Sequence, residues 1–466
     1  MNLTYLIEGI YLVASILFIL GLKGLSHPDT ARRGMIQAAC GMGAAIVGTL
    51  FRPEILHGNY LWIVIGLVVG SAIGIPISRV PMTAMPQRTA LSHAFGALAA
   101  SLVGIAEYII HRPEITSRQP GHGNVENGAL ALEVMLGSLT VTGSLIAAAK
   151  LQELMRGTPI MFKGQQALNL VLFVTMVGSF VLWMIHPASS VYFYTMAGCA
   201  FAFGVMLVIP IGAADMPVVM SLLNSYAGLS SAATGFVLHN NVLIIAGTLD
   251  GFSGFILSIL MCRAMNRSIT NVLFGGFGAV TGTDTGSTEG TMREVTLDDV
   301  AVQLAYASSV VIVPGYGMAT AQAQHAAREL GNVLEERGIS VKYAIHPVAG
   351  RMPGHMNVLL AEANVPYSSL YEMEQINPEM PTVDVAVVVG ANDVVNPDAR
   401  DNPKSPIAGM PIIEVDRAKS VVVLKRGKGK GFSGLENPLF FKPVTGMLYG
   451  DAKSTLTALA QAVQKV

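Results

Sequence analysis

The chain has 466 residues, of which 52% are hydrophobic and only 13% carry a charge, and its net charge is −1. A soluble globular domain usually contains about 25% charged residues, so an ordinary cytosolic enzyme and a disordered chain are both excluded. The balanced charge gives no indication of a nucleic-acid partner. Cys40, Cys199 and Cys262 lie in apolar stretches without metal-binding spacing, which favours a role as small buried side chains.

The charge is distributed unevenly along the chain. Residues 1–270 contain 23 charged side chains, whereas residues 271–466 contain 36 in a shorter stretch. This contrast predicts a transmembrane domain over residues 1–270, a linker over residues 271–292 and a soluble domain over residues 293–466.

Nine segments of the first part have the length and apolar composition of transmembrane helices. They are Leu3–Leu22, Met35–Phe51, Tyr60–Ile77, Leu91–Ile110, Ala129–Ala149, Leu168–Ile185, Val191–Ile211, Met216–Leu238 and Val242–Met265. The first is not expected to be a cleaved signal, because it contains Glu8 and lacks a basic start. Met216–Leu238 is the least typical, since it is rich in Ser, Gly and Asn.

The charges of the loops predict the orientation in the membrane. With the C-terminal domain in the cytoplasm, ten Lys and Arg residues fall in cytoplasmic connections and three, Arg52, Arg112 and Arg118, fall on the opposite side. Cytoplasmic loops are the ones enriched in Lys and Arg. We therefore expect a multi-pass membrane protein with its N-terminus outside and its C-terminal domain in the cytoplasm.

Seven ionisable or amide side chains fall at or near membrane depth, where each is costly unless it is paired or hydrated. His93 titrates near neutral pH and can relay protons, although an interfacial, hydrogen-bonded histidine fits the sequence equally well. Hydrogen bonds between helices are the simpler explanation for the two amides, and a capping or solvated position competes for three of the carboxyl groups. The seven are His93, Glu107, Glu133, Asp215, Asn224, Asn240 and Asp250.

Residues 274–291 are rich in Gly and Thr, which is linker composition. Beyond them strands and helices alternate, which predicts a parallel, doubly wound, Rossmann-like α/β sheet. The expected strands are Val310–Pro314, Val341–Ile345, Val383–Gly390, Pro411–Val415 and Ser420–Lys425. The expected helices are Gly315–Arg337, Gly354–Asn364 and Asp451–Val463.

The first expected strand runs directly into Gly315-Tyr316-Gly317, a GxG turn with a strand before it and a helix after it. In a dinucleotide-binding turn the first glycine permits the tight bend, and the second lets the pyrophosphate approach the backbone. Thr320 stands at the third small position, where Gly or Ala is usual. The context therefore predicts a dinucleotide site.

Two further features favour NADP over NAD. NAD-binding domains usually place an acidic residue at the end of the second strand, but here that strand runs into His346 without a carboxylate. Another strand ends in Lys425-Arg426, followed by Lys428 and Lys430, and such a cationic cluster suits an additional phosphate group. A basic loop exposed to solvent would have the same composition. The cluster therefore favours NADP only in combination with the missing carboxylate after the second strand.

A second match to GxGxxG, Gly429–Gly434, leads into Leu-Glu-Asn-Pro rather than into a helix, and we do not interpret it as a second nucleotide site. The sequence shows no haem pair, flavin motif or Fe–S cysteine set. If the chain handles hydride, the other redox partner must therefore belong to another chain.

Several longer motifs resemble those of the β subunit of proton-translocating NAD(P) transhydrogenase, and the resemblance covers essentially the whole chain. In the soluble part they are residues 314–324, 345–362, 390–397, 403–411 and 450–453. In the membrane part they are residues 214–219, 223–226 and 261–268, the last with Arg263 where lysine is common.

The resemblance implies an NADP(H)-binding domain on a proton-conducting helix bundle. A partner α subunit would bind NAD(H), hydride would pass from NADH to NADP, and αβ units would form a dimer in the lipid. It also implies a bacterial inner membrane as the location. Direct hydride transfer between two nicotinamides needs no general acid, base or nucleophile, so we expect no conventional catalytic residue and no metal. The residues it assigns to the proton pathway and its coupling are His93, Asn224, Asp215, Asn240 and Asp393. Those it assigns to the cofactor are Gly315, Tyr316, Gly317, Met318, Ala319, Gly350, Arg351, Gly390, Ala391, Asn392, Asp393, Lys425, Arg426, Gly431, Asp451 and Ala452.

Some positions depart from the family pattern. Phe432 stands where tyrosine is expected, Asp250 replaces an apolar residue, and Glu107 is also unexpected. Two other functions remain as alternatives for the whole chain: an NADP-regulated transporter without redox chemistry, and a membrane NADPH dehydrogenase that passes electrons to quinone. An NAD-binding chain encoded alongside would favour the transhydrogenase, and a bound flavin would favour the dehydrogenase.

Overall fold

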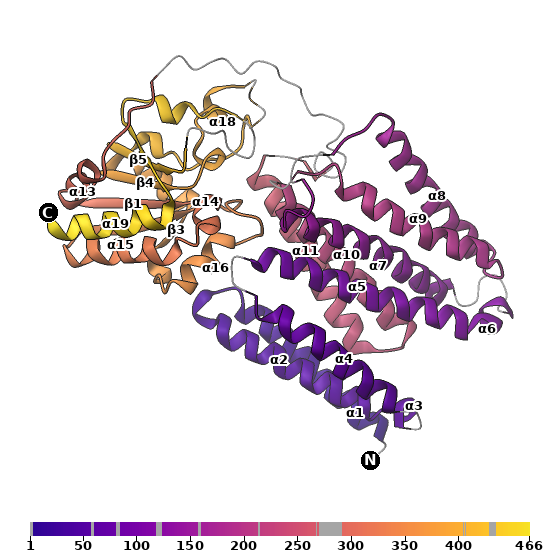
Figure 1. The fold of residues 1–466 in the computed structure, drawn as a ribbon. Coiled ribbons are helices and arrows are strands. Elements are labelled where there is room, and N and C mark those ends of the chain that lie inside the picture. Colours follow the sequence, from indigo (N-terminus) through magenta and orange to yellow (C-terminus); the bar gives the residue numbers. More distant parts are fainter. Residues whose placement is uncertain are drawn as a thin grey trace.

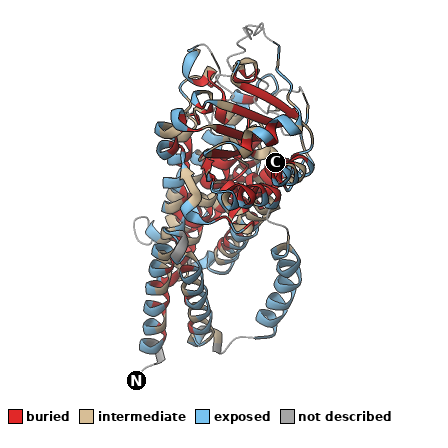
Figure 2. Ribbon diagram, turned by 90° about the vertical axis from the view of Figure 1, so that its left-hand side faces the viewer, coloured by how far each residue is buried: buried red, intermediate tan, exposed pale blue. Residues whose placement is uncertain are grey.

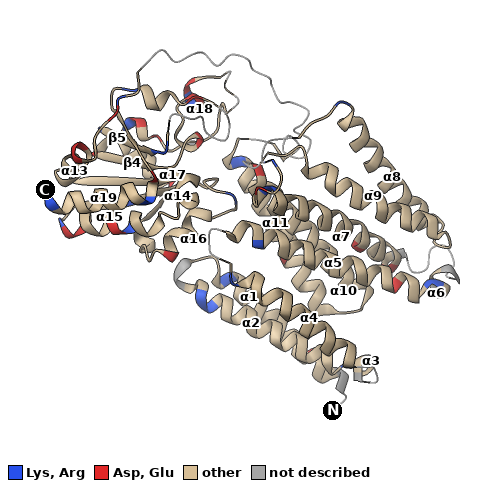
Figure 3. Ribbon diagram, viewed as in Figure 1, with Lys and Arg blue, Asp and Glu red and all other residues tan. Residues whose placement is uncertain are grey.

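The structure is a computed structural model, and it describes residues 3–56, 60–80, 84–117, 124–156, 160–212, 215–266, 268–269, 291–403, 405, 407–427 and 435–466. The N-terminal part is helical and the C-terminal part is an α/β domain (Figure 1). The linker expected over residues 271–292 lies almost wholly outside the described residues. Charged side chains are sparse along the N-terminal helices and frequent over the α/β part (Figure 3).

All nine expected spans coincide with helices. These are α1 (Leu3–Gly24), α2 (Pro28–Leu50), α4 (Tyr60–Ser78), α5 (Met85–Ile110), α7 (Asn124–Leu151), α8 (Gln165–Ile185), α9 (Ser190–Val208), α10 (Met216–Val237) and α11 (Asn241–Ala264), with α3 (Pro53–Leu56) and α6 (Arg112–Ser117) as short connections. Among the described residues, seven helices are long and apolar enough to cross a membrane by length and composition, and α2 and α10 are the two long helices that are not. α2 begins with charged residues, and α10 contains Ser, Thr and Asn, which lower their apolar character.

Small residues bring the helices of the bundle into close contact. A Cβ on Gly228 of α10 would lie 2.3 Å from the backbone nitrogen of Gly251 of α11, and a Cβ on Gly204 of α9 would lie 2.2 Å from the carbonyl oxygen of Leu139 of α7. Glycine at such positions allows helix backbones to approach in a membrane, where packing rather than hydrophobicity holds helices together. α4 differs, because it has no buried residue. Buried positions accordingly concentrate in the central helices and the sheet (Figure 2).

The α/β domain contains a six-stranded sheet in the order β3-β2-β1-β4-β5-β6, and every neighbouring pair is parallel. The strands are β1 (Ser309–Pro314), β2 (Ser340–Ile345), β3 (Leu370–Glu372), β4 (Val385–Val389), β5 (Ser420–Lys425) and β6 (Thr445–Tyr449). This is the doubly wound dinucleotide-binding order, so the expected fold class is confirmed. Both faces are covered, which is why the central strands are continuous runs of valine rather than alternating patterns.

Helices pack against one face of this sheet and shorter segments against the other. α13 (Leu297–Ala305), α15 (Gln324–Glu336), α16 (His355–Glu362) and α19 (Ala452–Lys465) share a core with alternate strand residues such as Val310 and Ile312. α17 (Met373–Ile376) and the turns η5 (Asn377–Thr382), η7 (Val415–Arg417) and η8 (Pro438–Phe441) cover the opposite face, which contains Val311 and Val313. η4 (Tyr367–Ser369), η6 (Asp393–Val395) and α18 (Asp398–Asp401) complete the connections.

Two expectations about elements were wrong. The helix expected over Gly315–Arg337 is divided into α14 (Tyr316–Thr320) and α15, because Gln322 between them has a left-handed backbone with φ of 50°. The strand expected over Pro411–Val415 is irregular, because the side chain of Asn377 accepts from the Glu414 amide at 3.0 Å and donates to the Ile412 carbonyl at 2.9 Å. These bonds satisfy backbone groups that a neighbouring strand would otherwise pair.

The sequence pattern also missed both edge strands and α13. β3 is only three residues long, too short to show a period. β6 contains Gly446, which weakens a strand pattern but is needed here, because a Cβ at that position would lie 2.7 Å from the Val295 side chain.

Candidate functional site

The strand order reverses at β1, which has β2 on one side and β4 on the other. In doubly wound sheets, ligands bind in the crevice at the carboxyl ends of the strands beside this switch point. The loops that follow β1, β2, β4, β5 and β6 therefore meet at one edge of the sheet. Lys425 is the last residue of β5, and the other described residues that the sequence assigned to the cofactor lie in these loops or directly after them.

The turns after β1 and β4 are in direct backbone contact. The amide of Gly315 donates to the Val389 carbonyl at 2.9 Å, and the amide of Gly317 donates to the Gly390 carbonyl at 2.8 Å. A Cβ on Gly317 would lie 2.7 Å from the Gly390 Cα, and Gly390 itself has φ of +64°. The glycines are thus also required by the approach of two chain segments, a reason that could not be predicted from the tight bend and the pyrophosphate contact alone.

The loop after β2 contains two buried histidines and a buried arginine. Burial lowers the pKa of His346, whose Nε2 lies 2.8 Å from the Pro411 carbonyl. Burial and the neighbouring Arg351 charge lower the pKa of His355 to about 4, and its Nδ1 accepts from the Arg351 amide at 3.0 Å. The guanidinium of Arg351 lies 4.4 Å from the centre of the Tyr316 ring, which connects this loop to the turn after β1.

A backbone hydrogen bond joins the ends of β5 and β6, and α19 begins directly after it. The amide of Gly450 donates to the Lys425 carbonyl at 3.0 Å, and Asp451 then caps α19 by accepting from the Ser454 amide at 3.2 Å. The Lys425 ammonium lies 4.7 Å from the centre of the Phe440 ring, and partial burial lowers its pKa. Arg426 is exposed beside it. Gly431 and Phe432, together with Lys428 and Lys430, lie outside the described residues.

The loop after β4 is fixed by amide side chains. Asn437 donates to the Asn392 carbonyl at 3.0 Å, and Asn392 donates to Asp393 Oδ1 at 3.2 Å. Asp393, which the sequence assigned to both the cofactor and the coupling, begins the turn η6 beside the glycine contact.

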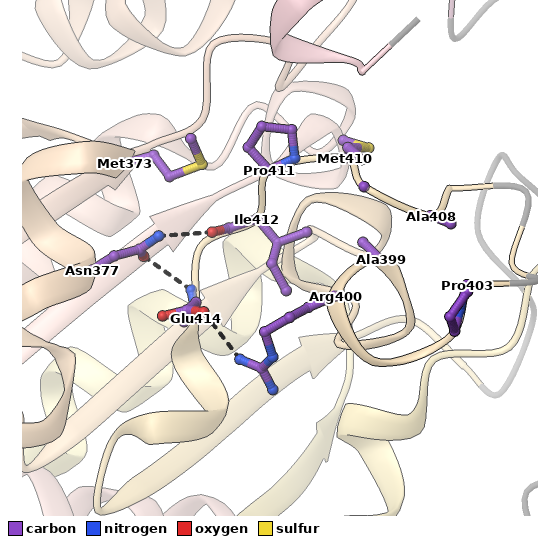
Figure 4. Close-up of a pocket in the computed structure, with 11 residues that line it drawn as sticks. Met373, Asn377, Ala399, Arg400, Pro403, Ala408, Met410, Pro411, Ile412 and Glu414 are labelled. Carbon is purple, nitrogen blue, oxygen red and sulfur yellow. Dashed lines mark hydrogen bonds and ion pairs between the residues drawn. The ribbon is translucent and has the colours of Figure 1, made fainter.

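A cavity of about 590 Å³ lies between α17 and the later part of the segment that joins β4 to β5, residues 399–414 (Figure 4). Arg400 and Glu414 form an ion pair of 3.1 Å on its wall, and Met373 and Met410 line it as well. None of the residues that the sequence assigned to the cofactor lines this cavity.

The structure places the predicted membrane residues in different settings. His93 lies on α5, and its Nδ1 is buried without a hydrogen-bond partner in the described part of the chain. Asn224 of α10 donates to Asp250 of α11 at 3.1 Å. Asn240 caps α11 by accepting from the Leu243 amide at 3.2 Å, and Asp215 occupies the N-cap position of α10. The structure thus gives Asn240 a helix-capping role and does not bring it to His93.

Comparison with known proteins identifies the family. The family model described as NAD(P) transhydrogenase beta subunit matches residues 7–462. Two relatives, the NAD(P) transhydrogenase subunit beta of Rhodospirillum rubrum and that of a named strain of the same species, are each 48% identical over 460 residues. Each match covers 97% of this chain and 98% of the relative. The chain belongs to the NAD(P) transhydrogenase beta-subunit family. It is therefore an integral membrane protein with a Rossmann-like domain, as the sequence predicted.

Side chains also join the membrane helices to the α/β domain, and the sequence analysis singled out Arg351 among them but neither Glu153 nor Asn266. Arg351 donates to the Leu151 carbonyl at the end of α7 at 2.8 Å and pairs with Glu153 at 2.9 Å. Asn266, just beyond α11, donates to the Ala408 carbonyl at 3.1 Å. The sequence carried one signal of the first contact, because Arg351 follows a strand of the expected nucleotide edge, but nothing in it indicated Glu153 as the partner.

Proposed function

We propose that the chain binds NADP(H) at the carboxyl edge of its sheet, accepts hydride from NADH held by a partner α subunit, and couples this transfer to proton movement across the membrane. Residues 293–466 would form the NADP(H) domain and residues 1–270 the proton-translocating domain. The observation that carries the proposal is the match to the family over residues 7–462, together with the arrangement of the predicted cofactor residues along one edge of the sheet.

The residues present fit a phosphorylated dinucleotide. β2 ends at Ile345 and is followed by buried His346, so no carboxylate follows it to select an unmodified ribose. Lys425 and Arg426 lie on the β5 side of the switch point, and Arg351 lies on the β2 side. If Lys425 and Arg426 hold the 2′-phosphate, the adenosine end lies toward β5 and the nicotinamide end toward β1 and β2.

Hydride transfer between two nicotinamides does not require an acidic or basic side chain of this chain to take part in the reaction. A bound nicotinamide supplies the hydride-carrying carbon, and transfer between two such rings requires alignment and exclusion of water rather than a general acid or nucleophile. The contribution of this chain is to hold the dinucleotide across the glycine contact and to position it for the partner. A beta subunit alone is thus expected to bind nucleotide without catalysing transfer.

Coupling to protons supplies the direction of the reaction. NADH and NADPH have nearly equal intrinsic potentials, whereas moving one charge through the membrane contributes about 2.3 kcal/mol per 100 mV. Coupling requires that protonation in the bundle favours one nucleotide-binding state over another. His93 and Asn224 are the proposed membrane groups, and Asp393 is the proposed link at the nucleotide edge.

The membrane orientation and the assembly belong to the same proposal. The loop charges support a cytoplasmic α/β domain and an outside N-terminus in a bacterial inner membrane. The subunit name of the relatives supports an α partner, and we propose a dimer of αβ units surrounded by lipid.

The deciding experiment is co-purification with the α chain encoded alongside, followed by hydride-transfer assays in sealed vesicles. The expected result is NADP reduction by NADH that accelerates under an imposed proton gradient and loses this acceleration with an uncoupler. NADP binding without any hydride transfer would instead support a nucleotide-regulated transporter, and a flavin in the complex would support a quinone-linked dehydrogenase.

A further inference from the structure

Glu133 occupies an unusual position that the proposed function does not use. It lies within α7 and is fully buried, and neither carboxyl oxygen has a hydrogen-bond partner among the described residues. A Cβ on Gly104 of α5 would lie 3.0 Å from the Glu133 Cδ and 3.2 Å from one of its oxygens. The glycine therefore provides the space that the carboxyl group fills.

The groups that face Glu133 do not neutralise a negative charge. On α10 the Ser230 hydroxyl donates to the backbone carbonyl of Glu133 at 2.8 Å, and the Thr234 hydroxyl donates to the Ser230 backbone carbonyl at 3.0 Å. The Thr234 hydroxyl and the Gly104 backbone also lie beside the carboxyl group, and both are uncharged. On α5 the titratable neighbour is Glu107, itself a carboxyl group, which pairs with His111 at 2.8 Å. An ionised carboxylate without a cation is costly at membrane depth, so the group holds a proton whenever no water reaches it.

Glu133 also lies in line with other polar groups between α5, α7 and α10. Gly104, which touches Glu133, is eleven residues after His93 on α5, a separation of about 16 Å along the helix. Between these two levels the Ser101 and Ser138 hydroxyls lie 3.5 Å apart. Ser144, eleven residues after Glu133 on α7, lies near the level of His93 and is buried without a hydrogen-bond partner in the described residues. Glu107 and His111 continue the series beyond Glu133 to the end of α5.

We propose that Glu133 is a proton-binding residue of the translocation route, between His93 and the side of the membrane at which α5 ends. This inference rests on the proposed function, because it presupposes that the bundle conducts protons. In each cycle the carboxylic acid releases H⁺ toward the serine hydroxyls and His93, and the carboxylate takes up H⁺ from the side of Glu107, or the reverse. No other bond changes.

The test uses the αβ complex in sealed vesicles with Glu133→Gln, which keeps the volume and polarity of the side chain but cannot release a proton. Proton pumping and coupled hydride transfer are expected to fall by about 100-fold, the lower range for a positioned proton-transfer group. The affinity for NADPH and the amount of assembled complex remain unchanged. Glu126→Gln, a half-exposed position near the start of the same helix whose side chain lies 3.7 Å from the His239 ring nitrogen, is the matched control and is expected to pump as the unchanged complex does.

Two results overturn the inference. Pumping at the wild-type rate by Glu133→Gln makes Glu133 a packing residue, and so does a Glu133→Asp complex that pumps with an unchanged pH profile. If the Glu133→Gln complex fails to assemble, the Glu133→Asp complex provides the test by itself. Its shorter side chain moves the carboxyl group, so a carboxyl group on the proton route must shift the pH profile of pumping. Infrared spectroscopy adds a direct signature, a carbonyl band of a protonated carboxyl group that Glu133→Gln abolishes and Glu126→Gln retains. If the unchanged αβ complex transfers no hydride, the proposed function itself fails, which this comparison separates from a failure at Glu133.

Discussion

At the scale of single residues, burial decides the charge that several side chains can carry. Burial lowers the pKa of His355 to about 4 from its ordinary value of 6.5. In the unfolded chain the imidazole of His355 thus becomes protonated below about pH 6.5, whereas in the folded chain it becomes protonated only below about pH 4. Because the unfolded chain binds more protons between these two pH values, the free energy of unfolding falls as the pH decreases from 6.5 toward 4, and His355 causes no such loss above pH 6.5.

Replacing His355 by a side chain that does not titrate should make the free energy of unfolding less sensitive to acid. The shift corresponds to about 3 kcal/mol lost between pH 6.5 and 4. His355→Gln is expected to lower the melting temperature less on going from pH 7 to pH 5 than the unchanged protein does. The exposed His325→Gln on α15 is the control and keeps the original acid sensitivity. Equal acid sensitivity of His355→Gln and the unchanged protein would contradict the buried neutral state.

The cationic pair after β5 gives a prediction about nucleotide choice. Lys425→Ala with Arg426→Ala is expected to weaken NADPH binding by about 1.5–3 kcal/mol for each charged hydrogen bond lost. NADH binding by the partner stays unchanged, since its site lies on the other chain. Calorimetry on the αβ complex measures both affinities. Lys419→Ala, at the opposite end of β5, is the control, and equal losses for the two nucleotides would exclude a 2′-phosphate role.

His93 gives a prediction about coupling. His93→Ala removes the proposed proton carrier of α5 without touching the α/β domain, so gradient-coupled hydride transfer is expected to be nearly abolished while NADP binding persists. Vesicle pumping and NADPH titration measure the two effects separately. His27→Ala, in the connection between α1 and α2, is the control. Undiminished pumping by His93→Ala would remove His93 from the route.

At the scale of elements, the nucleotide edge depends on two turns that leave no space for side chains. A Cβ on Gly390 would lie 2.5 Å from the Gly317 Cα and 2.6 Å from the Met318 nitrogen. Neither neighbour is a flexible side chain, so the turns after β1 and β4 would have to separate.

Gly390→Ala is expected to cost about 3 kcal/mol, from backbone strain and the clash together, and to weaken NADP binding. Gly338→Ala isolates the strain, because Gly338 has φ of +80° with no atom within 4 Å of its Cβ, and it is expected to cost about 1 kcal/mol. Denaturant unfolding and NADP titration compare the two variants. Similar costs for both would mean that the turns separate without penalty.

At the scale of the whole molecule, Arg351 is one of the side chains that connect the α/β domain to the membrane helices. Arg351 is 7% exposed and contacts both the Tyr316 ring and the end of α7. Glu153, which completes the contact, has a left-handed backbone with φ of 60° that a non-glycine residue rarely adopts. The ion pair with Arg351 thus accompanies an unfavourable backbone conformation of Glu153, where the membrane helices meet the α/β domain.

Glu153→Ala is expected to increase hydrogen exchange in the loop after β2, since one of its anchors to α7 is lost. The effect on overall stability stays below about 1 kcal/mol, because the Glu153 side chain is 72% exposed. Exchange measured by mass spectrometry on the purified complex tests this. Glu379→Ala, which removes an ion pair to Lys342 within the α/β domain, is the control and leaves that loop unchanged. Unchanged exchange in Glu153→Ala would show that the Leu151 carbonyl alone anchors Arg351.

The sequence by itself determined the features that depend on neighbouring residues. Long apolar segments specify helices because a membrane leaves no other way to satisfy the backbone, and the valine-rich runs β1, β4 and β5 specify buried parallel strands. The GxG turn and the cations after β5 follow directly from these strands. The break at Gln322 and the short edge strand β3 were not predictable, since local patterns do not record a left-handed turn or a three-residue strand.

Only the tertiary structure decided which distant groups meet. Glu153 and Arg351 are 198 positions apart, and Gly104 and Glu133 belong to different helices, so no periodicity could pair them. Such contacts arise when whole elements pack, and packing depends on the shapes of all their side chains at once. For this reason the sequence predicted a nucleotide edge and a helical bundle, whereas the contact between them and the unpaired acid inside the bundle emerged from the folded chain.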